Sequence, residues 1–318
     1  MMWQTYSQLE ALLCELVSWE SKSGSKGEIT FPYQFKDKLM ELAYFRENPS
    51  HIQFHNADKE RNAVTALYKH KEATKTVVLI SHFDTVHTKD FGALEQYALQ
   101  PKELIKQFKK IIDQLPENAR TDVNSNDYLF GRGTMDMKMG LALHMHIMEI
   151  ASTENWPINL LLVTVPDEEV ASDGMRAVVK DLVKLREKHQ LKYSLFLNSE
   201  PSFTQHPQDE NYYIYSGTIG KIMPSALFYG RETHAGEPLS GINAHYMASF
   251  MTNRMEYASD FTEEAYGEKT PPPVCLKTID LKKDYSTQTS NHVAALYNVF
   301  LMKQDAKSVM NTFRKVAN

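Results

Sequence analysis

Histidine and carboxylate side chains occur in four short motifs along the first 200 residues. The motifs are SHFDTVH at 81–87, GRGTMDMKMG at 131–140, PDEEVAS at 166–172 and NSEP at 198–201. Imidazole nitrogens and carboxylate oxygens are the usual ligands of zinc and similar divalent ions. Such an ion can activate water if a nearby carboxylate takes the proton. Together, the motifs predict a metal-dependent hydrolytic site.

Each motif taken alone also has an ordinary interpretation. His82 and Asp84 could be a solvated loop histidine beside a capping aspartate. Asp136 follows a Gly-rich turn and could be the N-cap of a helix. Glu168 and Glu169 could belong to a solvated acidic loop, and the acidic residue of NSEP is equally ordinary. Only the joint occurrence at the ends of apolar stretches favours a site, because ligands of α/β sheets bind at the carboxyl ends of the strands.

The elements that must position these motifs alternate between strands and helices. Continuous apolar runs predict strands at 76–80, 158–165 and 193–197 that are buried on both faces. Helices are expected at about 137–152 and 174–189. This alternation predicts an α/β fold with a doubly wound, mostly parallel sheet.

The remaining pattern predicts further elements and a second domain. A first helix is expected around 9–17, a second at about 36–46, and a weakly alternating strand at 63–69. After about residue 214 the order becomes β-α-β-β-α. The elements of this part are expected at 219–230, 242–256, 274–281, 292–302 and 305–317. We therefore expect two domains, 1–214 and 215–318.

Composition and charge exclude several classes of partner. The formal net charge is -5 and the pI is about 6.2, so we expect no nucleic-acid partner and no attraction to an anionic membrane. The first residues have no basic region followed by an apolar core, so they predict an amphipathic helix and not a signal peptide. Cys14 and Cys275 are isolated, which predicts reduced thiols and a cytoplasmic location.

The wording SHFDTV, GRGTMDMKMG and PDEEVAS resembles the M20 family of zinc metallopeptidases and amidohydrolases, and most of all its arginine-utilisation branch. The resemblance extends over almost the whole chain from about residue 10. It implies a zinc-peptidase-like sheet with an inserted ferredoxin-like lid domain, and a homodimer formed through that lid. It also implies two zinc ions, for which cobalt or manganese could substitute, and a small peptide or N-acyl amino acid as substrate.

The resemblance assigns a role to each candidate residue of the first domain. His82 would be a ligand of one zinc and Asp84 would orient it. Asp136 would bridge both zinc ions, and its peptide bond to Met137 would be cis. Glu168 would be the general base and proton shuttle. The remaining ligands would be Glu169 on the second zinc and Glu200 on the first.

Three residues of the second domain are assigned in the same way. His234 in GRETHAG would stabilise the developing oxyanion, and Asn243 would help to bind substrate. Family members often carry a carboxylate-binding arginine on a lid strand, where this chain has Phe300, so Arg254 is expected to substitute for it. His144 and His146 lie two apart on a helix and are assigned to packing or surface positions.

The chain departs from the family pattern at its end. Asn318 falls inside the second domain, so we expect the last lid strand and the returning catalytic segment, which carries a final ligand histidine, to be absent. His292 is not assigned to that role, and full occupancy by two zinc ions is not expected. The alternative function is a catalytically incomplete, truncated homologue that acts at most as a metal-binding or dimerisation module.

Overall fold

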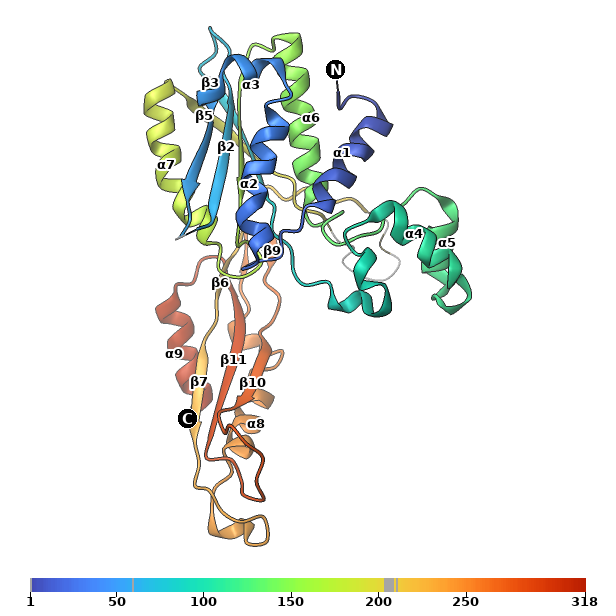
Figure 1. The fold of residues 1–318 in the computed structure, drawn as a ribbon. Helices are drawn as coiled ribbons and strands as arrows, with labels where there is room; N and C mark the ends of the chain where they lie inside the picture. Colours follow the sequence, from blue (N-terminus) through green and yellow to red (C-terminus); the bar gives the residue numbers. More distant parts are fainter. Residues whose placement is uncertain (1, 59, 203–208, 210) are drawn as a thin grey trace. The chain divides into compact units, whose positions relative to one another are not determined.

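The computed structural model describes residues 2–58, 60–202, 209 and 211–318, and it divides the chain into two compact units (Figure 1). Unit 1 is Met1–Tyr212 and unit 2 is Tyr213–Asn318. Both combine helices with sheets, which confirms the predicted mixed α/β class. Among the described residues, every helix is too short or too polar to cross a membrane.

Five strands form the sheet of unit 1 in the order β1-β2-β4-β3-β5. They are β1 (Ile52–Asn56), β2 (Asn62–Tyr68), β3 (Lys75–His82), β4 (Asn159–Val165) and β5 (Lys192–Asn198). β3 is parallel to β4 and β5, whereas β2 is antiparallel to β1 and β4. The prediction of a mostly parallel sheet is therefore wrong for β1 and β2. Only a few residues separate β1 from β2 in sequence, and a connection this short permits antiparallel but not parallel pairing of the two strands.

The predicted strands differ in how deeply they are buried. Every residue of β4 is buried, as expected for a central strand covered on both faces. β5 was predicted to be buried as well, but it lies at the edge of the sheet, and Leu195 and Phe196 are 49% and 52% exposed. An apolar run in the sequence shows strand propensity, but its burial depends on neighbours that the run does not specify.

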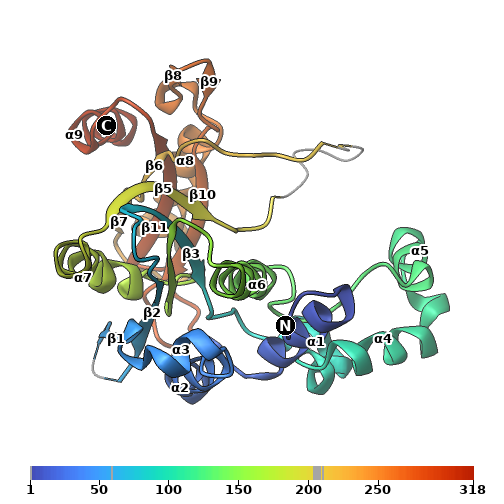
Figure 2. The same cartoon turned by 90° about the horizontal axis from the view of Figure 1, so that it is seen from above.

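Helices cover both faces of this sheet (Figure 2). α1 (Tyr6–Ser18), α2 (Lys26–Leu39) and α6 (Lys138–Glu154) pack into one apolar core with the sheet, and α7 (Asp173–His189) packs into a second core. The helix predicted at 36–46 is wrong, because α2 ends at Leu39 and a separate short helix, α3 (Ala43–Glu47), follows a turn. The Ser25 hydroxyl accepts a hydrogen bond from the Glu28 amide and caps the start of α2.

A helical segment between β3 and α6 was not predicted from the sequence. It contains the 3-10 helices η2 (Lys89–Tyr97) and η3 (Ile112–Gln114), and the α-helices α4 (Pro101–Lys110) and α5 (Glu117–Ser125). Charged and amide side chains dominate α4 and α5, so neither helix contains a long apolar run, although α4 is amphipathic. Arg132 attaches the segment to the turn before α6 through an ion pair with Asp90.

Unit 2 contains a separate sheet with helices on one face. β11 (His292–Leu301) is its central strand, antiparallel to β10 (Val274–Asp280) on one side and to β6 (Gly220–Ile222) and β7 (Ser225–Tyr229) on the other. α8 (Ala244–Met255) and α9 (Ala306–Ala317) share a core with β11. The smaller elements are η1 (Pro49–His51) in unit 1 and η4 (Pro238–Ser240), η5 (Ser259–Phe261), β8 (Glu264–Ala265) and β9 (Glu268–Lys269) in unit 2.

Candidate metal centre

The centre is built around His82, the last residue of the buried strand β3. Its side chain is 1% exposed, and its Nε2 atom lies 3.0 Å from Asp136 Oδ1. The same nitrogen lies 3.6 Å from Glu200 Oε1. Glu200 follows β5, which is parallel to β3, so the two strands end at the same edge of the sheet. Sheet topology therefore brings residues 82 and 200 together across more than 100 positions of sequence.

Asp84 is completely buried and connects His82 to the acidic loop that follows β4. Its carboxylate accepts hydrogen bonds from the Glu168 amide at 3.0 Å and the Glu169 amide at 3.3 Å. The same carboxylate lies 3.4 Å from His82 Nδ1, which is also 3.0 Å from the Asp84 carbonyl oxygen. Asp84 thus fixes the orientation of the imidazole, as carboxylates beside metal-binding histidines commonly do.

The Ser23 hydroxyl donates a further hydrogen bond to Asp84 Oδ2 at 2.7 Å. Burial alone would raise the pKa of Asp84, but the hydrogen bonds from His82 and Ser23 outweigh it and lower that pKa. Asp84 therefore remains an anion that can accept several bonds at once. Sequence reasoning missed Ser23, because nothing in the local pattern around 21–25 indicates a contact with a residue 61 positions away.

Asp136 lies in a tight turn directly before α6. The Asp136–Met137 peptide bond is cis, as predicted from the family resemblance. Gly133 has a φ of 78°, and a Cβ atom there would lie 2.9 Å from the Thr85 side chain, so only glycine fits this position easily. Met137, and not Asp136, is the N-cap of α6. The N-cap interpretation of Asp136 is therefore wrong, and its carboxylate faces His82 instead.

Glu168 and Glu169 differ in their contacts. Glu168 Oε2 lies 3.8 Å from His82 Nε2, and the side chain is 47% exposed. Burial raises the pKa of Glu168, with Glu200 adding to the rise and His82 opposing it. Burial and the charge of Asp136 raise the pKa of Glu169. Both carboxylates thus hold a proton more readily than an isolated glutamate does.

The donor atoms of three residues fit a divalent metal ion. His82, Asp136 and Glu200 each offer one ligand atom, and these atoms lie within 4.8 Å of one another. Burial opposes a charge on the imidazole, but the hydrogen bonds to Asp136 and Asp84 outweigh it and raise the pKa of His82 to about 12. Asp136 and Glu200 are among the carboxylates that favour a proton on His82. With a metal ion in place of that proton, the same two carboxylates and the neutral imidazole would be its ligands. One nitrogen and two oxygen donors suit zinc.

The three candidate residues of unit 2 make mainly local contacts. His234 is exposed, and its Nδ1 atom accepts a hydrogen bond from the Gly236 amide at 3.0 Å. Asn243 is the N-cap of α8, and its side chain accepts from the His245 amide at 2.9 Å. Arg254 is exposed in the last turn of α8. The helix-capping role of Asn243 is one that the sequence analysis did not consider.

Two buried basic residues near the centre have structural contacts. Lys138 Nζ donates to the carbonyl oxygens of Leu16 and Trp19 at 2.9 and 2.8 Å, and burial lowers the pKa of Lys138 to about 7. His144 Nε2 lies 2.6 Å from the hydroxyl of Ser199, the residue before Glu200. His144 was assigned from the sequence to a packing or surface position, and its contact with Ser199 was not predicted. A basic residue in an otherwise apolar helix is the sequence signal that could have indicated both positions.

Comparison with known proteins identifies related sequences. Residues 108–299 match the model of Peptidase family M20/M25/M40. The chain is 43% identical to protein YqjN of Bacillus subtilis over all of its own length and 58% of that protein. It is 33% identical to protein RocB of B. subtilis over 97% of its length and 55% of that protein. The chain therefore spans little more than half the length of these two relatives.

Solved structures share the fold. A tripeptidase from Staphylococcus aureus aligns with 99% of this chain and 71% of its own, with a TM-score of 0.60 at 16% identity. At this identity the likeness concerns the fold alone.

Proposed function

Because the chain belongs to Peptidase family M20/M25/M40, we propose that it supplies the catalytic residues for metal-dependent hydrolysis of an amide or peptide bond. The observation that carries the proposal is the arrangement around His82, where Asp136, Glu200 and Glu168 approach the same imidazole nitrogen. Three of these four residues would hold a metal ion. The fourth, Glu168, is left to act on water.

We assign the metal ligands by donor type and position. His82, Asp136 and Glu200 would hold the first ion, and Asp136 and Glu169 would contribute to a second. Zinc is the expected metal, and cobalt or manganese have suitable ligand preferences as well. A bound ion supplies a Lewis acid that polarises the scissile carbonyl group and lowers the pKa of water.

Glu168 is the proposed general base. Its carboxylate is close to His82 yet 47% exposed, so water and substrate can reach it. The raised pKa of Glu168 suits a group that first takes a proton from the attacking water and then gives it to the leaving amine nitrogen. The Asp84 carboxylate accepts a hydrogen bond from the Glu168 amide at 3.0 Å and thereby fixes the backbone from which the Glu168 side chain extends.

The remaining assignments follow the family resemblance. Unit 1 would be the catalytic domain, and unit 2 the lid through which two copies form a dimer. His234 would stabilise the developing oxyanion, while Asn243 and Arg254 would bind substrate. A small peptide or an N-acyl amino acid is the proposed substrate, and the similarity to RocB supports a role in arginine utilisation. The isolated cysteines support a cytoplasmic location.

A second candidate is a metal-binding or dimerisation module without turnover. The group of three donors at His82, Asp136 and Glu200 favours this candidate, because it can hold one metal ion, whereas the proposed hydrolase uses two. This candidate predicts metal binding and no hydrolysis.

The test is a hydrolysis assay with dipeptides and N-acyl amino acids in the presence of zinc, cobalt or manganese. Glu168→Gln should bind metal like the wild type and lose turnover, since the amide cannot accept the proton. Glu187→Gln, an exposed glutamate of α7, is the matched control and should retain activity. Equal activity of Glu168→Gln and wild type would refute the role of Glu168. Metal binding without turnover by the wild type would favour the second candidate.

A further inference from the structure

We propose that Arg61 is a positioning residue that fixes the loop carrying Glu168 and Glu169 by holding Asp167. The inference rests on the proposed function, because Arg61 would act by positioning the general base Glu168 and the metal ligand Glu169. Arg61 touches neither of these two residues directly, so its effect would pass through the backbone of the loop.

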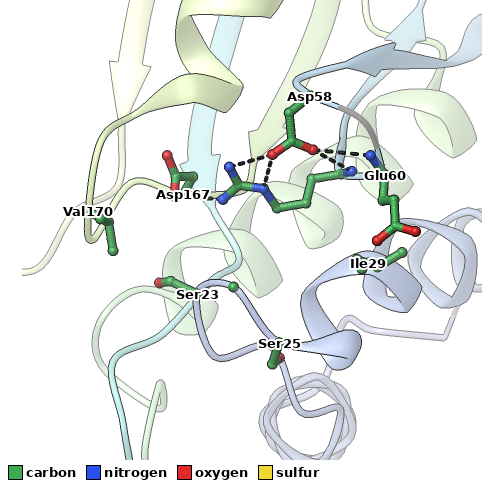
Figure 3. Close-up of a pocket in the computed structure, with 9 residues that line it drawn as sticks. Ser23, Ser25, Ile29, Asp58, Glu60, Asp167 and Val170 are labelled. Carbon is green, nitrogen blue, oxygen red and sulfur yellow. Dashed lines mark hydrogen bonds and ion pairs between the residues drawn. The ribbon is translucent and has the colours of Figure 1, made fainter.

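The guanidinium group of Arg61 bridges two aspartates from different parts of unit 1. Its Nη1 atom donates to Asp167 Oδ1 at 2.6 Å, and its Nε atom donates to Asp58 Oδ2 at 2.7 Å. Arg61 is itself 14% exposed. Arg61, Asp58 and Asp167 line an open cavity of about 650 Å³ together with Ser23 and Ser25. Figure 3 shows Asp58 and Asp167 on one side of this cavity and Ser23 and Ser25 on the other. A planar fork of several donors is needed to hold both carboxylates at once.

Asp167 in turn fixes the start of the acidic loop. It is 4% exposed and has a φ of 66°, a left-handed conformation that is uncommon for a residue other than glycine. Its carboxylate accepts from the Asp173 amide at 3.1 Å, and its carbonyl oxygen accepts from the Ser172 amide at 2.6 Å. The last residues of the loop 167–173 are therefore hydrogen-bonded back to Asp167, its first residue. Glu168 is the next residue along the chain.

A buried glutamate completes the network. Glu28 is completely buried, and its Oε1 atom accepts from the Asp167 amide at 2.9 Å. Arg61 Nη1 lies 3.6 Å from the same oxygen. Arg61 is thus the cation beside two buried carboxylates, Glu28 and Asp167. Removing it leaves their charges uncompensated, which is costly in a buried position.

The acidic loop is therefore held from two sides. Asp84 binds the amides of Glu168 and Glu169, and the Arg61 network binds Asp167 directly before them. If the Arg61 network is lost, one anchor remains and the two glutamates gain freedom. Misplacement of a catalytic group by about 1 Å can reduce turnover about 100-fold. Substrate affinity should change little, because none of these contacts involves a proposed substrate-binding residue.

The experiment compares Arg61→Met, Arg61→Lys and the control Arg120→Met by hydrogen–deuterium exchange and by kinetics. Arg120 is exposed on α5, away from the acidic loop in sequence. In Arg61→Met, amide exchange in 167–173 should accelerate about tenfold or more, because loss of a hydrogen bond between charged groups raises the population of the locally open loop by at least about that factor. In active protein, kcat should fall about 100-fold with KM nearly unchanged. Arg61→Lys should give intermediate values.

Unchanged exchange in 167–173 of Arg61→Met would overturn the inference. Equal acceleration throughout β3 and β4 in both Arg61 variants would overturn it as well, because it would show a general loss of stability. If the wild type hydrolyses no substrate, the proposed function fails, while the exchange measurement still decides whether Arg61 fixes the loop.

Discussion

Units 1 and 2 position their candidate residues in contrasting ways. In unit 1, His82 and Asp84 are 1% and 0% exposed, and their hydrogen bonds join segments that are distant in sequence. In unit 2, His234 and Asn243 take their orientation from amides two residues away. A metal centre needs ligands whose charges are fixed by buried partners, whereas a polar group that only meets substrate can be positioned by a turn or a cap. The two regions should therefore respond differently to mutation.

The largest effect in unit 2 is expected for His234→Gln. If the imidazole stabilises a developing oxyanion, its loss should lower kcat by about 100-fold to 1,000-fold. Metal content should stay at the wild-type value, because the proposed ligands all lie in unit 1. Steady-state kinetics with metal analysis of the same sample provides the measurement. Loss of metal from this variant would contradict the proposed division between the units.

Asp84→Asn should weaken metal binding by about 10-fold to 100-fold, since the carboxylate that orients His82 is replaced by an amide. In either amide orientation, one of the Glu168 and Glu169 amides faces an NH2 group, which cannot accept its hydrogen bond. We also expect a loss of about 1–3 kcal/mol in the free energy of unfolding, because a buried backbone donor loses its partner. Metal titration and urea unfolding test both effects. Wild-type metal affinity would show that Asp84 does not position the centre.

Glu28→Gln should change how stability depends on pH. Burial raises the pKa of Glu28 from 4.5 to about 6, although the nearby Arg61 opposes the rise. A raised pKa in the folded state contributes stability that is present below pH 4.5 and is lost as the pH rises through about 6.

The wild type should therefore lose about 1–2 kcal/mol of stability over this interval from Glu28, and Glu28→Gln should lack that part of the slope. Urea unfolding at several pH values between 4 and 7 measures the difference. Parallel pH profiles for the two proteins would refute the assignment.

The smallest effect is expected for Asn243→Ala. Loss of the N-cap of α8 should cost about 1 kcal/mol in the free energy of unfolding. Asn253→Ala, at an exposed position of the same helix, is the control and should cost less. Denaturant unfolding provides the stability, and KM shows whether Asn243 also binds substrate. A large rise in KM without loss of stability would show that Asn243 binds substrate and does not mainly cap α8.

The local parts of the candidate centre could be predicted from sequence. Apolar runs that end shortly before His82 and Glu168 predicted β3 and β4, and parallel pairing places the ends of these strands at one edge of the sheet. The cis bond after Asp136 followed from the family wording and is confirmed. These features can be predicted because each depends on residues that are adjacent in the sequence.

The supporting contacts could not be predicted, because they depend on tertiary packing. Ser23 reaches Asp84, and Arg61 reaches Asp167 across 106 positions of sequence. The exposure of β5 was missed for the same reason, because it follows from the position of the strand at the edge of the sheet. An amphipathic or apolar pattern states what a segment can form, but not which neighbours complete it.

The most direct test of the account is the zinc content of the purified chain, compared with Asp136→Ala and with the control Asp113→Ala at an exposed position. We predict at least one tightly bound zinc ion per chain in the wild type and in the control, and its loss in Asp136→Ala. A second zinc ion that is lost in Glu169→Ala would extend the assignment to the full pair. Absence of zinc from the wild type, or equal zinc in Asp136→Ala, would contradict the metal centre proposed for this edge of the sheet.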